Sequence, residues 1–155
     1  MFKEMRRKDR EISEKEAWAV IEAAEYGILS TTGGDAKPYA IPVSHVVMDE
    51  KIYFHCALDV GHKLENIKAN PSVCFTVVGQ TQVLPEKFST NYESAVVFGT
   101  AGPVEGEVKA AALIAIIQKF SPEFYEKGMQ YIEKAAEKTA VYEITPEQVT
   151  GKAKR

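Results

Sequence analysis

The sequence contains few cysteines and no long apolar run. Its two cysteines, Cys56 and Cys74, form neither a C-x-x-C pair nor a cluster with histidine, so a zinc site is not expected. The longest apolar run covers residues 110–117 and is too short to span a bilayer. The first residues are charged and lack the apolar stretch of a secretory signal. We therefore expect a cytoplasmic protein with reduced thiols and no membrane partner.

Several motifs of nucleotide binding and hydrolysis are also missing. No G-x-G-x-x-G follows a strand, and there is no P-loop, G-x-S-x-G or H-E-x-x-H. Rossmann-type nucleotide binding, serine hydrolysis of the α/β type and zinc proteolysis therefore have no support. If a nucleotide binds, it is held by other means.

The charge is nearly balanced and slightly negative. The net charge of −3 argues against nucleic acid as the main partner, because phosphate binding generally needs a basic excess. Four basic residues are nevertheless grouped near the start, at Arg6, Arg7, Lys8 and Arg10. Such a group is usually a solvated tail, although it could fold over an anionic substrate or a partner subunit.

The pattern of elements predicts one α+β domain over residues 1–155. Ser13 and Glu16 form a capping box, so a helix is expected over 13–25. Further helices are expected over 61–69 and 105–120 and from Ser121-Pro122 onward. Strands are expected over 26–32, 37–48, 51–57, 73–78, 92–104 and 139–145, with a loop over 79–90 and Pro146 closing the last strand. Without βαβ units these strands should pair antiparallel and close into a small barrel.

The helix expected over 105–120 is apolar all round in its middle turns. A helix of this kind is normally covered on more than one side. This pattern favours an additional packing partner, such as a second copy of the chain.

The most suggestive local motif is Gly61-His62-Lys63, where a strand and loop give way to a short helix. Exposed N–H groups at a helix start favour anions, and a lysine ammonium suits phosphate. The alternative is an ordinary solvated helix start. The run from Asn91 to Ser94 has the same two interpretations, a set of ligand donors or a plain strand start.

The three histidines, His45, His55 and His62, are close in sequence. A metal site would need these histidines to converge on one point together with carboxylate or thiolate ligands. His55 and Cys56 are consecutive, so on a strand they should point to opposite faces. We therefore expect packed strand histidines and no metal ion.

Five segments in succession carry a specific resemblance: residues 5–12, 26–46, 51–78, 91–101 and 141–152. They include Y-G-I-L-S-T-T, P-Y-A-I-P-V-S-H-V, K-I-Y-F-H-C-A, V-G-H-K-L-E-N-I and V-Y-E-I-T-P-E-Q-V-T-G-K. In this order the sequence resembles the pyridoxamine 5′-phosphate oxidase-like flavoproteins, and within them the Nim-type nitroimidazole-resistance proteins. The similarity extends over nearly the whole chain.

The resemblance implies a six-stranded antiparallel split β-barrel flanked by helices, assembled as a homodimer with FMN at the interface. The flavin ring would lie along residues 42–45, and its phosphate near 55–57 and 62–63. Tyr92 and Ser94 would approach from another strand or from the partner subunit. The implied cofactor-binding residues are Pro42, Val43, Ser44, His45, His55, Cys56, Ala57, His62, Lys63, Tyr92 and Ser94.

His62 is the expected catalytic residue, because the resemblance places it beside the flavin and the substrate pocket. Many broader family members have arginine at this position, so His62 favours the Nim-like branch over pyridoxamine phosphate oxidation. The implied activity is an FMN-dependent oxidoreductase that passes electrons from an unknown donor to a small acceptor such as a nitroimidazole. The alternatives are a non-catalytic flavin- or haem-binding protein on the same barrel and a relative that uses a deazaflavin.

Overall fold

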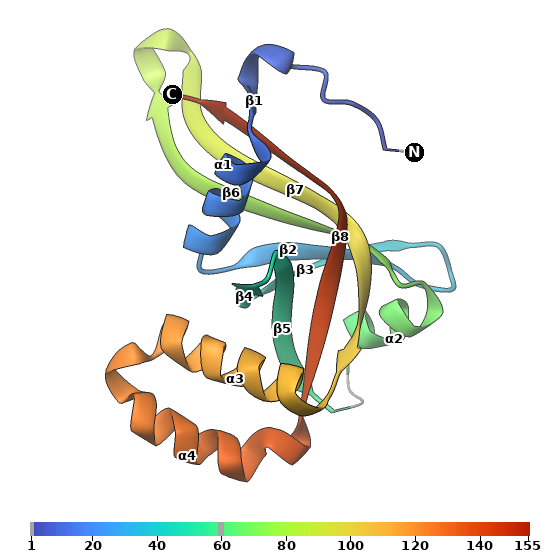
Figure 1. The fold of residues 1–155 in the computed structure, drawn as a ribbon. Coiled ribbons are helices and arrows are strands. Elements are labelled where there is room, and N and C mark those ends of the chain that lie inside the picture. The colour runs from blue at the N-terminus through green and yellow to red at the C-terminus, as the bar shows by residue number, and fades with distance from the viewer. Residues whose placement is uncertain (1, 59–60) are drawn as a thin grey trace.

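The computed structural model describes residues 2–58 and 61–155. Over these residues the chain forms one antiparallel sheet of eight strands (Figure 1). The strands are β1 (Glu11–Ile12), β2 (Gly27–Thr32), β3 (Pro38–Val43), β4 (His45–Met48), β5 (Lys51–Ala57), β6 (Ser72–Leu84), β7 (Ser89–Val104) and β8 (Thr139–Lys154). Their order across the sheet is β3-β2-β6-β7-β8-β5-β4, and β1 pairs with β8.

The two edges of this sheet are consecutive in the chain. β3 forms one edge, β4 forms the other, and only Ser44 separates them in sequence. The sheet must therefore curl so that the end of β3 lies next to the start of β4. Among the described residues no hydrogen-bonded ladder joins β3 to β4, so the sheet stays open. This open, curled sheet is consistent with a split barrel.

The expected number of six strands was too low. The strand expected over 37–48 is interrupted at Ser44 and becomes β3 and β4, while Glu11–Ile12 adds the short β1 along β8. These two differences account for the eight strands that the structure contains. The antiparallel α+β class itself is confirmed.

Three strands continue through segments that were expected to be irregular. β6 and β7 extend through most of residues 79–90 as a hairpin, with Leu84 paired to Ser89. β8 passes Pro146 because the register shifts there, opposite Gly99. A proline lacks the N–H that a ladder needs, so it is tolerated at such an irregularity, and a side chain at Gly99 would overlap the carbonyl of Thr145.

Four α-helices complete the described chain: α1 (Glu14–Ala23), α2 (His62–Ala69), α3 (Gly106–Phe120) and α4 (Tyr125–Ala135). Short 3₁₀ turns cover Lys8–Arg10, Pro85–Lys87, Pro122–Phe124 and Ala136–Lys138. The expected helices are confirmed, with boundaries that differ by up to a few residues. None of the helices in the described residues is long and apolar enough to cross a membrane.

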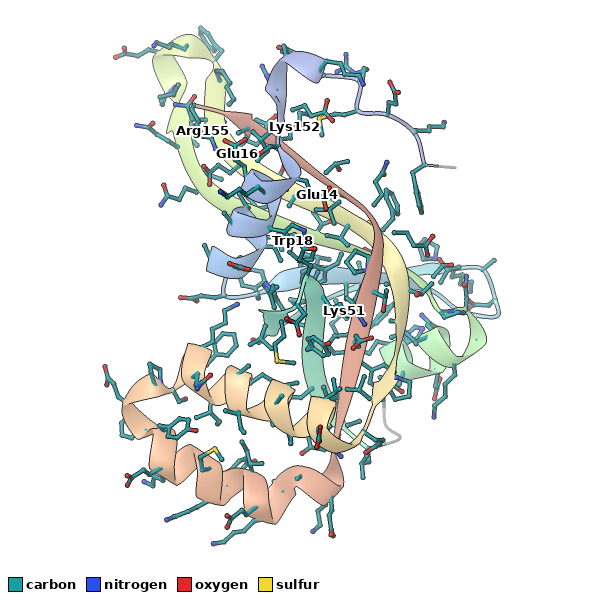
Figure 2. The ribbon with its side chains drawn as sticks, viewed as in Figure 1. Glu14, Glu16, Trp18, Lys51, Lys152 and Arg155 are labelled. Atoms are coloured by element: carbon teal, nitrogen blue, oxygen red, sulfur yellow. The ribbon has the colours of Figure 1, made fainter. Side chains whose placement is uncertain are left out.

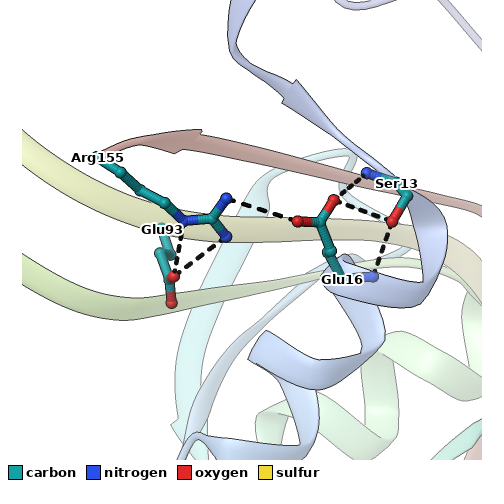
Figure 3. Close-up of polar contacts among 4 residues, drawn as sticks. All are labelled: Ser13, Glu16, Glu93 and Arg155. Atoms are coloured by element: carbon teal, nitrogen blue, oxygen red, sulfur yellow. Dashed lines mark hydrogen bonds and ion pairs between the residues drawn. The ribbon is translucent and has the colours of Figure 1, made fainter.

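The start of α1 is fixed by the predicted capping box. The backbone N–H of Glu16 donates to Ser13 Oγ at 3.2 Å, and the Ser13 N–H donates to Glu16 Oε2 at 2.9 Å. The other oxygen of Glu16 forms an ion pair with Arg155 at 3.5 Å, and Arg155 also pairs with Glu93 at 3.3 Å (Figure 3). The capped end of α1 is thereby joined to β7 and to the end of β8.

The interior divides into two apolar clusters. The larger cluster lies between α1 and the inner face of the sheet, with Ile21, Leu29 and Phe75 fully buried. The smaller cluster lies under α3, around Tyr53, Leu113 and Val141. α4 packs on α3 through Ile132, and Ala136 of the following 3₁₀ turn joins the same cluster. Within one chain only Ala112 and Leu113 of α3 are buried, and residues 114–117 are half-buried, so α3 keeps accessible apolar surface.

Candidate functional site

The first turn of α2 presents Gly61, His62 and Lys63. Gly61 has a φ of 116°, which favours glycine,. The helix is anchored from below, because Leu64, Asn66 and Ile67 are buried and Asn66 Nδ2 donates to Thr31 Oγ1 at 2.9 Å. His62 is exposed and Lys63 half-buried. The anchored helix thus holds a cation and an imidazole at a fixed place on the surface.

His62 lies against Tyr39 of β3. The two rings stack with centroids 4.0 Å apart and an interplanar angle of 23°. Stacking engages the faces of the imidazole rather than the nitrogen atoms at its edge. Tyr39 was not among the predicted site residues, since nothing in its local sequence connects it to a residue more than twenty positions away.

Lys63 lies close enough to β5 to act electrostatically on two of its residues. Desolvation lowers the pKa of His55, and the positive charge of Lys63 lowers this pKa further. Burial raises the pKa of the Cys56 thiol, and Lys63 opposes that change. Lys63 therefore lies near enough to His55 and Cys56 for its charge to act on both side chains.

Strand alternation separates the β5 residues. Cys56 packs against the larger apolar cluster. His55 points the other way and lines a pocket of about 100 Å³ with residues of α3 and α4 that include Leu113 and Tyr131. Ala57 is exposed. Of these three side chains, His55 and Ala57 are therefore placed to meet a ligand, while Cys56 faces the interior.

The residues of β3 and β4 alternate in the same manner. Pro42 and Ser44 are exposed, whereas Val43 packs against the larger apolar cluster. A cofactor along this strand would meet the side chains of Pro42 and Ser44. Val43 would offer only its backbone.

The structure places the side chain of His45 in the interior, so a cofactor along this strand would meet only the backbone of His45. His45 is fully buried, its Nε2 lies 2.7 Å from the carbonyl oxygen of Ile21, and its ring meets the edge of Phe75. Lys119 Nζ donates to the carbonyl oxygens of His45 and Ala24 at 2.7 and 2.6 Å. Burial lowers the pKa of His45 to about 4. His45 is thus a neutral core residue that connects β4 with α1.

Tyr92 and Ser94 belong to the first part of β7, and Figure 1 shows that β7 begins at a hairpin that lies away from α2. Arg10 Nη1 donates to the Tyr92 hydroxyl at 3.5 Å, and this hydrogen bond lowers the pKa of Tyr92. Lys152 Nζ lies 5.8 Å from the centre of the Tyr92 ring. A single chain therefore does not bring these two residues to the first turn of α2.

The outer face of the sheet connects these regions. Its strand register forms a row from Pro42 through Ile28, Thr76 and Val96 to Thr150. A parallel row contains Ser30, Cys74, Phe98 and Gln148. The side chains from Ile28 to Thr150 in the first row are half-buried, and Pro42 and Phe98 are exposed. We call the surface made of these two rows together with Ser94 and Lys152 the outer face.

A curled, open antiparallel sheet of eight strands with four α-helices, counted over the described residues, defines an α+β protein of split-barrel type. The family model described as pyridoxamine 5′-phosphate oxidase matches residues 13–153. The chain belongs to this family. No curated protein sequence matches it significantly.

Solved structures share the fold. A candidate 5-nitroimidazole antibiotic resistance protein from Bacteroides thetaiotaomicron is 23% identical, with a TM-score of 0.78 over 92% of this chain and 86% of that chain. The flavocytochrome Anf3 from Azotobacter vinelandii is 18% identical, with a TM-score of 0.82 over 98% of this chain and 72% of that chain. An FAD-binding protein from Mycobacterium smegmatis is 25% identical, with a TM-score of 0.67 over 94% of this chain and 98% of that chain.

Proposed function

We propose that this protein is an FMN-binding flavoprotein of the Nim-like branch that reduces small acceptors such as nitroimidazoles. The observation that carries the proposal is the first turn of α2, where Lys63 lies near His55 and His62 stacks on Tyr39. A lysine ammonium and helix N–H groups suit a phosphate. The exposed Pro42 and Ser44 on β3 and its junction with β4 offer a surface for a flat ring. The flavin-binding and nitroimidazole-resistance relatives support the same assignment.

When bound, FMN would supply the electron transfer, and the protein would supply binding and orientation. Lys63 would hold the phosphate. His62 would lie beside the reacting groups with its ring fixed by Tyr39, so that a ring nitrogen can donate a proton or hydrogen bond to the acceptor. A well-placed general acid contributes about 10²–10⁴-fold to the rate.

The proposed working form is a homodimer. The first part of β7, which carries Tyr92 and Ser94, lies away from α2 within one chain (Figure 1), but these residues can reach the cofactor of a second copy if the outer faces meet. The outer face is half-buried and mostly uncharged, as expected for a surface that another subunit covers. An obligate interface of this kind would bury on the order of 2,000 Å² or more.

The proposal is tested by titrating FMN and riboflavin into the flavin-free protein. Lys63→Ala should weaken FMN binding by about ten- to a hundredfold, because a hydrogen bond to a charged group contributes about 1.5–3 kcal/mol. Riboflavin lacks the phosphate, so its affinity should not change. Lys68→Ala, on the same helix, is the matched control. Equal losses for both ligands would remove Lys63 from the phosphate site, and haem binding without flavin binding would favour the non-catalytic alternative.

The role of His62 is tested separately by reoxidation of the reduced, FMN-saturated protein with a nitroimidazole. His62→Gln should leave FMN affinity nearly unchanged and slow reoxidation by at least tenfold, because the proton donor is lost. An unchanged rate with weaker FMN binding would show that His62 only helps to hold the phosphate.

A further inference from the structure

The helices α3 and α4 lie side by side at the end of the molecule away from the β6–β7 hairpin (Figure 1). They approach closely at Gly128, where a Cβ atom would lie 2.6 Å from Ile117 Cγ2. None of the residues of α4, all of which the structure describes, is fully buried. Figure 2 shows side chains of α4 that project into open space on the side away from the sheet. One side of α4 therefore packs on α3, while the rest of its surface is accessible.

A cleft of about 490 Å³ opens beside this helix contact. Ile117 and Gly128 line it, and Phe124 and Tyr131 add two aromatic rings that remain 61% and 70% exposed. Large apolar side chains that are exposed next to one another commonly mark a binding surface. The volume lies within the range of roughly 300–1,000 Å³ that small-molecule pockets have.

The charged residues that line the cleft are two lysines, Lys127 and Lys134, and its described lining contains no aspartate or glutamate. Lys127, Tyr131 and Lys134 follow one another at helical spacing, so they share one face of α4,. Glu126 and Glu133 each precede one of the lysines and are turned from it by about 100°, toward the opposite face. No ion pair joins either lysine to a carboxylate in the part of the chain that the structure describes. The cleft thus combines positive charge with aromatic surface.

This cleft is separate from the candidate cofactor site and from the outer face. None of its described lining residues is expected to bind the cofactor, and none belongs to the outer face. It shares Ile117 and Tyr131 with the small pocket at His55 but does not include His55 itself. A second copy of the chain is an unfavourable occupant, because a symmetric contact through this face would bring the lysines of both copies together.

We propose that this cleft binds an aromatic carboxylate of two fused rings. The rings would pack on Phe124, Tyr131 and Ile117, and the carboxylate would meet one of the lysines. Lys127 and Lys134 are separated by two turns of α4, about 10 Å along the helix axis. A ligand longer than a single ring can therefore contact the aromatic surface and a lysine at the same time. This binding does not depend on the proposed flavin chemistry.

The test uses 2-naphthoate and its neutral analogue 2-naphthylmethanol, with binding measured calorimetrically on the full chain. Saturable binding of 2-naphthoate is expected. The double variant Lys127→Met/Lys134→Met should weaken it by about tenfold, because each exposed ion pair contributes a few-fold, and should change binding of the alcohol less than twofold. Added salt should weaken binding of the acid to the parent but not to the double variant. Lys15→Met/Lys87→Met removes the same charge from α1 and the hairpin and should have no effect.

The aromatic contact is tested at Tyr131, whose exposure makes a loss of folding unexpected. Tyr131→Ala should weaken both compounds by about tenfold, whereas Tyr131→Phe keeps the ring and should bind like the parent. The absence of saturable 2-naphthoate binding overturns the inference, and so does unchanged binding in Tyr131→Ala or in the double lysine variant. If the parent binds no 2-naphthoate and Tyr131→Ala loses self-association in sedimentation, a second copy occupies the cleft and the inference is wrong.

The same samples separate this inference from the proposed function. FMN titrated into the double lysine variant should bind with the affinity of the parent, and weaker FMN binding would assign these lysines to the cofactor instead. A protein that binds FMN but not 2-naphthoate removes the cleft and leaves the flavoprotein assignment. A protein that binds 2-naphthoate but no FMN retains the cleft and removes that assignment.

Discussion

The inner and outer faces of the same three strands have very different surroundings. On the inner face Leu29, Phe75 and Val97 are register neighbours, and all three are fully buried beneath α1 and the rest of the sheet. One residue along each strand, Ser30, Cys74 and Phe98 form the corresponding outer row, and Phe98 remains 37% exposed. The inner face is completed by the fold of one chain. The outer face is not, so it is the surface on which a ligand or a second copy can be accommodated.

The largest expected loss of stability comes from truncating a residue of the inner face. Phe75→Ala should lower the free energy of unfolding by about 3–5 kcal/mol, since a fully buried ring is replaced by a cavity. The Phe75 ring also lies at a steep angle to the His45 ring, 5.0 Å away between centroids, and it packs on Gly27, where any side chain would overlap it. Urea denaturation measures the loss. Cys74→Ala, the adjacent outer residue, should cost less than about 1 kcal/mol; similar losses at both positions would erase the distinction between the faces.

The next largest effect is a pH dependence of the free energy of unfolding, and it originates from a buried residue of the inner face. The pKa of buried His45 is lowered to about 4, below the value of about 6.5 that it has in the unfolded chain. Above pH 6.5 the residue is neutral in both states. As the pH falls from 6.5 to about 4, His45 binds a proton in the unfolded chain but not in the folded protein. The free energy of unfolding should therefore fall by about 3 kcal/mol over this range.

Denaturation curves between pH 7.5 and 4.5 measure this slope. His45→Gln should be less stable at pH 7 but should show a flatter dependence. His62→Gln removes an exposed histidine from the same chain and should retain the slope of the parent. An equally steep slope in His45→Gln would assign the effect to other groups.

The smallest effect on stability is expected from the outer face. Thr76→Lys places a charge in the middle of the row that contains Ile28 and Val96. The free energy of unfolding of one chain should change by less than about 1 kcal/mol, while association should be lost, because an unpaired charge in an interface is costly. Sedimentation at micromolar concentration should give a monomer. Ala19→Lys, on the exposed side of α1, should sediment like the parent; a dimeric Thr76→Lys would show that the copies meet elsewhere.

The sequence predicted what depends on neighbouring residues. The capping box of Ser13 and Glu16 lies within one turn, so its pattern was sufficient. Pro146 was misleading, because the irregularity that accommodates it depends on Gly99, which lies across the sheet. The burial of His45 also depends on which face of the curled sheet β4 turns inward, and local sequence does not encode that choice.

In the candidate site, too, the features set by neighbouring residues could be predicted and those set by distant residues could not. Gly61, His62 and Lys63 are consecutive and could be recognised as one motif. The stacking of His62 on Tyr39 joins α2 to β3, and only the packing of α2 on β2 creates that contact.

The position of β8 has a consequence for how the chain folds. β8 lies between β7 and β5, so before residues 139–154 are available the sheet consists of two unconnected pieces, β3-β2-β6-β7 and β5-β4. These two pieces can be joined only after residues 139–154 have been synthesised. Because such long-range strand pairing is slow, β7 and β5 should each expose an unpaired edge in the nascent protein until β8 is in place. Those edges are the surfaces that a chaperone would have to protect.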